Sequence, residues 1–183
     1  MKKTITILLV IVFAVSMIFA QGALPNKGDK FVGARIGLGS YGAGVGFGGG
    51  FEMILQEDFL NLADIPGALG VGGSFGYSTY KSGYVGYNWK YTNMVFLASV
   101  FYHADVLKNE KIDTYAKFSL GYNAGKVKYD GPSGISNYSS PTYGGVVTGS
   151  AVGARYFISK ALAAVAEVGW GFGILRLGLD LAL

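Results

Sequence analysis

The sequence carries the residue types of an acid–base catalyst at one place. His103-Ala104-Asp105 sets the single histidine of the chain close to a carboxylate. A histidine base needs a nucleophile within hydrogen-bond reach, and the sequence offers no convincing serine or threonine for that role. We therefore expect that the chain is not an enzyme, and we interpret His103 as a polar residue at a strand end, near an interface.

Metal and phosphate chemistry are equally unsupported by the residue pattern. The chain has no cysteine and no carboxylate cluster, so a zinc or calcium site is not expected. The run G-V-G-F-G-G-G at Gly44 to Gly50 lacks the Lys-Ser/Thr pair that follows a phosphate-binding loop. Its alternation is typical of a strand. We predict no metal and no cofactor.

The remaining charges follow a period of two, which is clearest between Gly173 and Leu183. Leucine occupies every second position there, and Arg176 and Asp180 lie among the residues between. Side chains alternate across a strand, so this spacing predicts a β-strand with one leucine face and one polar face. The same separation of apolar and polar residues recurs in other strands. It predicts that the charged residues on the polar faces form one cluster: Arg35, Glu52, Lys117, Arg155, Glu167, Arg176 and Asp180.

Eight strands are expected, at residues 31–39, 44–55, 68–80, 88–103, 112–128, 143–158, 161–170 and 173–183. Most are long enough to cross a bilayer at a tilt. Their apolar faces carry no charge, and a lysine or arginine facing lipid would cost about 2–4 kcal/mol. The prediction is an all-β fold, an eight-stranded antiparallel up-and-down transmembrane β-barrel. The fourth strand is apolar on both faces, so its inward face cannot be assigned.

The interior of such a barrel allows several functions. Eight strands enclose just enough room for side chains, which favours a filled, charge-paired interior with a structural or surface-interaction role. Glycines on the first three strands leave open a narrow, porin-like solute path. A soluble periplasmic barrel with a leucine-lined cavity for an apolar ligand is the other alternative. Only 14% of the residues are charged, and a soluble surface would place charges on every strand.

The beginning of the chain predicts export. Residues 1–20 combine two lysines, an apolar run and the small residue Ala20, the layout of a cleaved signal peptide. Residues 21–30 would form a short leader and 31–183 the barrel. Without Lys2 and Lys3 the formal charge falls from +4 to +2, so no nucleic-acid partner is expected. The predicted location is the outer membrane of a Gram-negative bacterium, with lipid as a partner.

Tyrosine and tryptophan residues concentrate near the predicted strand ends. With both termini on the periplasmic side, the segments 81–87 and 129–142 become outward loops and could bind a surface ligand. An aromatic girdle at the outer interface would consist of Tyr77, Tyr80, Tyr87, Trp89, Tyr91, Tyr122, Tyr143 and Trp170. An inner ring would consist of Phe101, Tyr102, Tyr156 and Phe157.

Several stretches resemble the small eight-stranded outer-membrane barrels, typified by the membrane domain of outer-membrane protein A. More narrowly, the chain is similar to the outer-membrane β-barrel domain proteins of Bacteroidetes-type bacteria. The stretches are F-A-Q at Phe19 to Gln21, G-V-G-G-S-F-G-Y at Gly70 to Tyr77, Y-H-A-D at Tyr102 to Asp105, Asp113 to Asn123, and the last strand. The resemblance implies insertion by the outer-membrane assembly machinery through the C-terminal strand, which ends here in Leu183 rather than in an aromatic residue. It implies no shared activity.

Overall fold

The computed structural model describes residues 24–40, 43–60, 62, 65–84, 87–129 and 141–183. The predicted signal peptide at 1–20 therefore lies outside the described residues, as does most of the predicted loop 129–142. Within the described ranges, no helix is long and apolar enough to cross a membrane.

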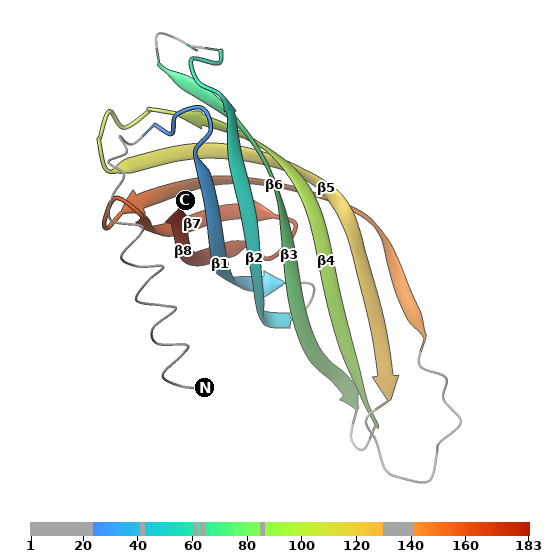
Figure 1. Cartoon of the computed structure of the whole chain (residues 1–183). Helices are drawn as coiled ribbons and strands as arrows, with labels where there is room; N and C mark the ends of the chain where they lie inside the picture. The colour runs from blue at the N-terminus through green and yellow to red at the C-terminus, as the bar shows by residue number, and fades with distance from the viewer. Residues whose placement is uncertain (1–23, 41–42, 61, 63–64, 85–86, 130–140) are drawn as a thin grey trace, which may run out of the picture.

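The chain forms a closed ring of eight antiparallel strands, each hydrogen-bonded to its neighbours in sequence, with β1 also paired to β8 (Figure 1). This confirms the predicted fold class and strand count. The strands are β1 (Lys30–Ser40), β2 (Ala43–Gln56), β3 (Gly67–Tyr84), β4 (Tyr87–Ala104), β5 (Ile112–Tyr129), β6 (Thr142–Phe157), β7 (Leu162–Trp170) and β8 (Leu175–Ala182).

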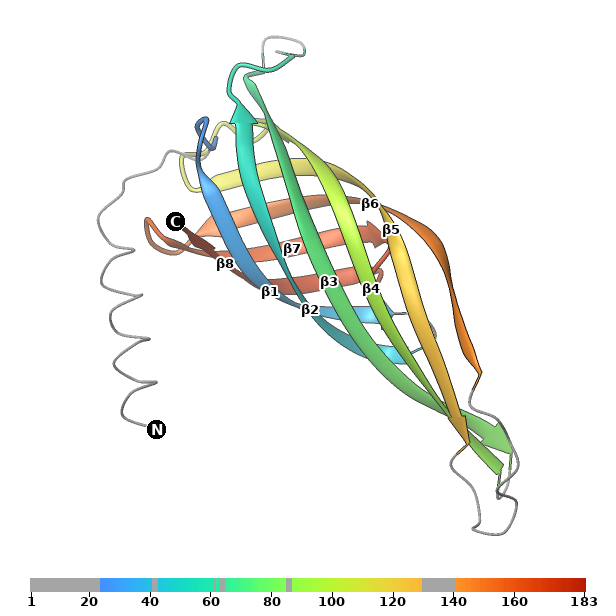
Figure 2. The same ribbon diagram turned by 45° about the vertical axis from the view of Figure 1, so that its right-hand side comes forward.

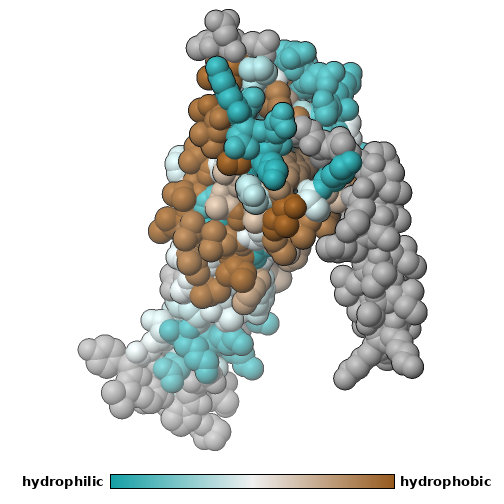
Figure 3. Space-filling model, turned by 90° about the vertical axis from the view of Figure 1, so that its left-hand side faces the viewer, coloured by the Kyte–Doolittle hydropathy of each residue, from teal (hydrophilic) through white to brown (hydrophobic). Residues whose placement is uncertain are grey.

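The outside of the barrel is apolar. Large hydrophobic side chains are exposed on every strand, among them Phe47 at 59%, Val146 at 75% and Leu179 at 50%. Figure 3 shows a hydrophobic band across the middle of one face, with hydrophilic residues toward both ends of the molecule. The leucines of β8 thus face outward, so the alternative of a soluble barrel with a leucine-lined cavity is wrong.

The inward face of β4, which the sequence left open, is defined by the structure. Val95, Ser99 and His103 are buried, whereas Met94 and Phe96 are exposed. Odd-numbered residues of β4 therefore point into the barrel. The two faces of β4 differ too little in hydropathy for the sequence to show which one points inward. The pairing of β4 with β3 and β5 determines which face that is.

Four strands continue beyond the closed part of the barrel. The pairing of β2 with β3 ends at Gly46 and Ser78, and that of β6 with β7 ends at Ser150 and Trp170. Beyond these pairs, β3, β4, β5 and β6 project as a four-stranded extension (Figure 2).

The prediction of a loop at 81–87 is wrong for most of that segment. β3 runs on to Tyr84 and β4 begins at Tyr87, and these two residues pair across the hairpin. Tyrosine and threonine at paired positions such as Tyr80–Tyr91 and Thr79–Thr92 favour strand pairing, and they outweigh the turn-forming glycines that suggested a loop.

Candidate functional site

The structure places all seven members of the predicted polar cluster inside the barrel. Five of them are nearly inaccessible: Glu52, Arg155, Glu167, Arg176 and Asp180. Arg35 and Lys117 keep 15% of their side-chain surface exposed. The strand alternation that carries apolar side chains outward carries these residues inward, where they meet across the lumen rather than along one strand.

Arg155 lies at the centre of one group of ion pairs. Its Nη2 atom donates to Glu52 Oε2 at 2.7 Å, its Nη1 to Asp113 Oδ2 at 2.6 Å and its Nε to Asp180 Oδ2 at 2.8 Å. The guanidinium also lies 4.0 Å from the ring centre of Phe31. One side chain of β6 thus ties β2, β5 and β8 together through the lumen.

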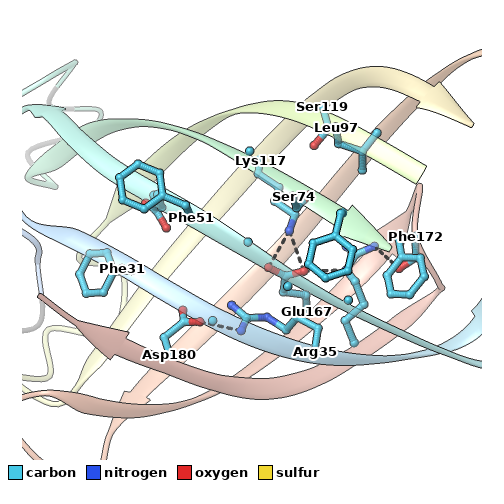
Figure 4. Close-up of a pocket in the computed structure, with 18 of the residues that line it drawn as sticks. Phe31, Arg35, Phe51, Ser74, Leu97, Lys117, Ser119, Glu167, Phe172 and Asp180 are labelled. Atoms are coloured by element: carbon cyan, nitrogen blue, oxygen red, sulfur yellow. Dashed lines mark hydrogen bonds and ion pairs between the residues drawn. The ribbon is translucent and has the colours of Figure 1, made fainter. Parts of the chain in front are cut away.

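Glu167 on β7 is the centre of a second group. Its carboxylate accepts hydrogen bonds from Lys117 Nζ at 2.7 Å, from Arg176 Nε at 2.6 Å and from the Tyr115 hydroxyl at 2.7 Å. Arg35 Nη1 donates to Asp180 Oδ1 at 2.6 Å, so Asp180 binds two arginines. Figure 4 shows the Arg35–Asp180 and Lys117–Glu167 pairs side by side in the lumen.

Three members of this network were missed by the sequence analysis: Tyr115, Asp113 and His103. Asp113 pairs with Arg155, and His103 lies between Glu52 and Asp113, with nitrogen–oxygen distances of 2.5 and 2.9 Å. The alternation could have revealed Asp113, because it lies four residues before Lys117 on the same face of β5. With Asp113 included, four cationic side chains (Arg35, Lys117, Arg155, Arg176) face four carboxylates (Glu52, Asp113, Glu167, Asp180).

The interpretation of His103 as an interface residue is wrong. Its side chain is completely buried, and both ring nitrogens are within hydrogen-bond distance of carboxylates. The residue faces inward because β4 directs its odd-numbered positions into the lumen. Both ring nitrogens are thus occupied and out of reach of a substrate. Within the described part of the chain, no group of three histidine, cysteine or acidic side chains could hold a metal ion.

Apolar side chains lie next to the charged network. Phe31, Ile54 and Ala68 pack together near the start of β1 and the end of β8, and Leu24, Phe157 and Ala182 contact them. In the β7–β8 connection, Phe172 is buried and turns into the lumen over the glycines of β2 and β3. A Cβ atom at Gly76 would lie only 2.2 Å from Phe172 Cδ2.

The glycines of the first three strands therefore do not simply leave an open path. The Phe172 ring occupies the space beside Gly46, Gly48 and Gly76. The cavity that remains in the lumen measures about 60 Å³, which is the volume of a few water molecules at most. Figure 4 shows Phe172 and the ion pairs together at this cavity.

The structure divides the residues of the predicted outer aromatic girdle between the two faces of the strands. Tyr77, Tyr122 and Trp170 are exposed on the outside of the barrel. Tyr80, Trp89, Tyr91 and Tyr143 are not part of such a girdle, because the alternation of β3, β4 and β6 directs them to the inner face, and the Tyr143 hydroxyl donates to Asn93 inside. The side chain of Tyr87 lies outside the described part of the structure.

The predicted inner ring is also divided between the two faces. Tyr156 is exposed on the outside, and the Tyr102 hydroxyl donates to the carbonyl oxygen of Leu60. Phe101 faces the lumen and packs against Tyr115, which contradicts its place in a ring at the membrane interface. Phe157 lies 6.4 Å from Phe31, ring centre to ring centre. The inner ring was predicted from residue type alone. Whether each of these side chains points into the lumen or outward depends on the face of the strand on which it lies.

The fold and its interior define a class of protein, an eight-stranded β-barrel with an apolar outside and a charge-paired inside. That distribution is the pattern of small barrels that span membranes.

The sequence matches no protein-family model and no curated protein. Among solved structures, the chain is similar to Ail, the attachment invasion locus protein of Yersinia pestis, in complex with the heparin analogue sucrose octasulfate. The identity is 10% and the TM-score 0.48, over 85% of this chain and 96% of that one. The backbone structure of Ail in a phospholipid bilayer nanodisc is similar with 17% identity and a TM-score of 0.44, over 86% of this chain and all of that one.

Proposed function

We propose that this chain is an integral outer-membrane β-barrel with a filled interior, and that it has a structural or surface-interaction role rather than that of a porin. The apolar outer face of the closed part of the barrel supports membrane insertion, since lipid would contact it directly. The basic, apolar and small-residue pattern of residues 1–20 supports export. Insertion would use the C-terminal strand, β8, as the signal for the assembly machinery.

The observation that carries this proposal is the network of paired, buried charges across the lumen. Arg155 contacts three carboxylates, and Glu167 binds Lys117 and Arg176. In a water-filled channel the lining charges stay hydrated, whereas here they satisfy one another. A buried charge is tolerated only when it is paired and hydrogen-bonded. The network therefore supports a packed core over a conduction path.

Phe172 supports the same proposal independently. Its ring lies over the glycines that would otherwise widen the lumen, and the cavity beside it is only about 60 Å³. A solute larger than water would have to displace both the ring and the ion pairs.

Planar-bilayer recording on refolded protein tests this function. We expect no stable conductance steps, because Phe172 and the ion pairs fill the lumen. Heat-dependent mobility on gels would show that the recorded sample is folded, and protein-free bilayers would give the background. Stable, large steps from folded protein would refute the filled interior. Recovery of the protein in the inner-membrane or soluble fraction of the envelope would refute the proposed location.

A further inference from the structure

The inner face of the four-stranded extension carries aromatic rings and amides rather than charges. Tyr80 and Tyr91 stack with ring centres 4.7 Å apart and planes 7° from parallel. With Asn93, Asn123 and Tyr143 they line a hollow of about 280 Å³. We call this feature the aromatic–amide hollow. It lies at the end of the barrel opposite the start of β1 and the end of β8, where β1, β2, β7 and β8 no longer close the ring (Figure 2).

Two polar atoms in the hollow have no hydrogen-bond partner among the described residues. Asn93 Oδ1 accepts from the Tyr143 hydroxyl at 2.7 Å and from Asn123 Nδ2 at 3.1 Å. Asn93 Nδ2 and Asn123 Oδ1 are buried and have no hydrogen-bond partner among the described residues. A buried amide group without a hydrogen-bond partner is unfavourable. One donor and one acceptor are thus left over on two neighbouring side chains.

The lining indicates the chemistry of a ligand. The five side chains carry no acidic group that would bind a cation and no basic group that would bind an anion. A wholly apolar ligand would leave the amide donor and acceptor unpaired. A neutral sugar presents apolar C–H faces that pack on tyrosine rings and hydroxyl groups that both donate and accept. The volume is slightly below the usual lower limit of ligand pockets, about 300 Å³, and suits a single sugar ring.

We propose that the aromatic–amide hollow binds one neutral sugar unit, with a sugar hydroxyl or acetamido group bonded to Asn93 and Asn123 and the ring packed on a tyrosine. The proposal rests on the function proposed above in one respect, since the outer-membrane orientation makes the hollow face the cell exterior. The binding chemistry itself depends only on the residues of the hollow.

Saturation-transfer difference NMR on the full barrel in lipid nanodiscs tests the proposal. The probes are the methyl glycosides of glucose, galactose, mannose and N-acetylglucosamine, together with glucose 6-sulfate. We expect saturable transfer to at least one neutral glycoside at millimolar concentration. Transfer to none of them would overturn the proposal and leave water as the occupant. A clear preference for the sulfated sugar would also overturn it, because no cationic side chain lines the hollow.

Two pairs of variants connect binding to the hollow. Asn93→Ala removes the unpaired donor, and we expect about tenfold weaker binding, the effect of losing one hydrogen bond. Asn88→Ala is the matched control, because Asn88 is exposed on the opposite face of β4. Tyr91→Ala should also weaken binding, whereas Tyr122→Ala on the outer face should not. Equal binding by Asn93→Ala and Asn88→Ala would contradict the assignment.

The wild-type experiment keeps the proposal testable if a variant does not fold, and heat-dependent gel mobility reports folding for each one. The outcomes also separate this proposal from the proposed function. A barrel that binds no sugar and conducts no ions refutes the hollow alone. A barrel that binds a glycoside but shows large conductance steps refutes the filled interior alone.

Discussion

Replacing Arg155 by methionine should destabilise the barrel more than the same change at Arg35. Arg155 is 1% exposed in its side chain and contacts Glu52, Asp113 and Asp180. In Arg155→Met, Glu52 and Asp113 retain only His103, and Asp180 retains only Arg35. Breaking a buried ion pair by removing one partner costs about 3–5 kcal/mol, and we expect the free energy of unfolding to fall by that amount.

Arg35→Met is the matched control because it makes the identical chemical change in the same lumen. Arg35 is 15% exposed in its side chain and pairs with one carboxylate, Asp180, which keeps its bond to Arg155 in the variant. No carboxylate is left without a cation. We expect a cost of about 1–2 kcal/mol, between the values of an exposed ion pair and of a buried charged hydrogen bond.

Urea titration of both variants in lipid vesicles, followed by tryptophan fluorescence, measures the difference. The barrel would be folded from urea into the same vesicles, and the unfolding and refolding curves must coincide before free energies are compared. A loss for Arg155→Met that is equal to or smaller than that for Arg35→Met would refute the reasoning. It would mean that the carboxylates around Arg155 are hydrated, and hence that the lumen is wet rather than packed.

Three further predictions follow from the two faces of the strands and from the chain start. Leu179→Arg places a charge on the lipid-facing side and should cost about 2–4 kcal/mol, whereas Leu179→Met keeps that face apolar and should cost less than about 1.5 kcal/mol; equal losses of the two variants in urea titration would contradict an outward-facing Leu179. Gly76→Ala should destabilise the barrel by about 1–3 kcal/mol through overpacking against Phe172, and in a Phe172→Ala background that penalty should disappear in a double-mutant cycle. Mass spectrometry of purified envelope protein should find a mature chain that begins near Gln21, and a retained N-terminal methionine would contradict cleavage.

The period-two pattern was sufficient to predict the strands and the faces of most of them. Leu177 and Leu179 alternate with charged or small residues, so the apolar face of β8 could be identified without a structure. The pattern failed on β4, where both faces are apolar, and His103 was misplaced for that reason. It also failed at 81–87, where glycine and tyrosine suggested a loop although the pairing of β3 with β4 continues to Tyr84.

Alternation predicts the face on which a residue lies, but the contacts across the lumen depend on the register of strands distant in sequence. Arg155 meets Glu52, which lies 103 residues away, only because the ring closes with the observed strand pairing. The same closure turns Phe172 over the glycines. The four-stranded extension has an inner face beyond the closed part of the barrel. Tyr91 and Tyr143 lie on that inner face and line the hollow, so they do not belong to an outer girdle. The sequence by itself thus determined the strand count and the distribution of polarity, and the tertiary structure decided which polar groups meet.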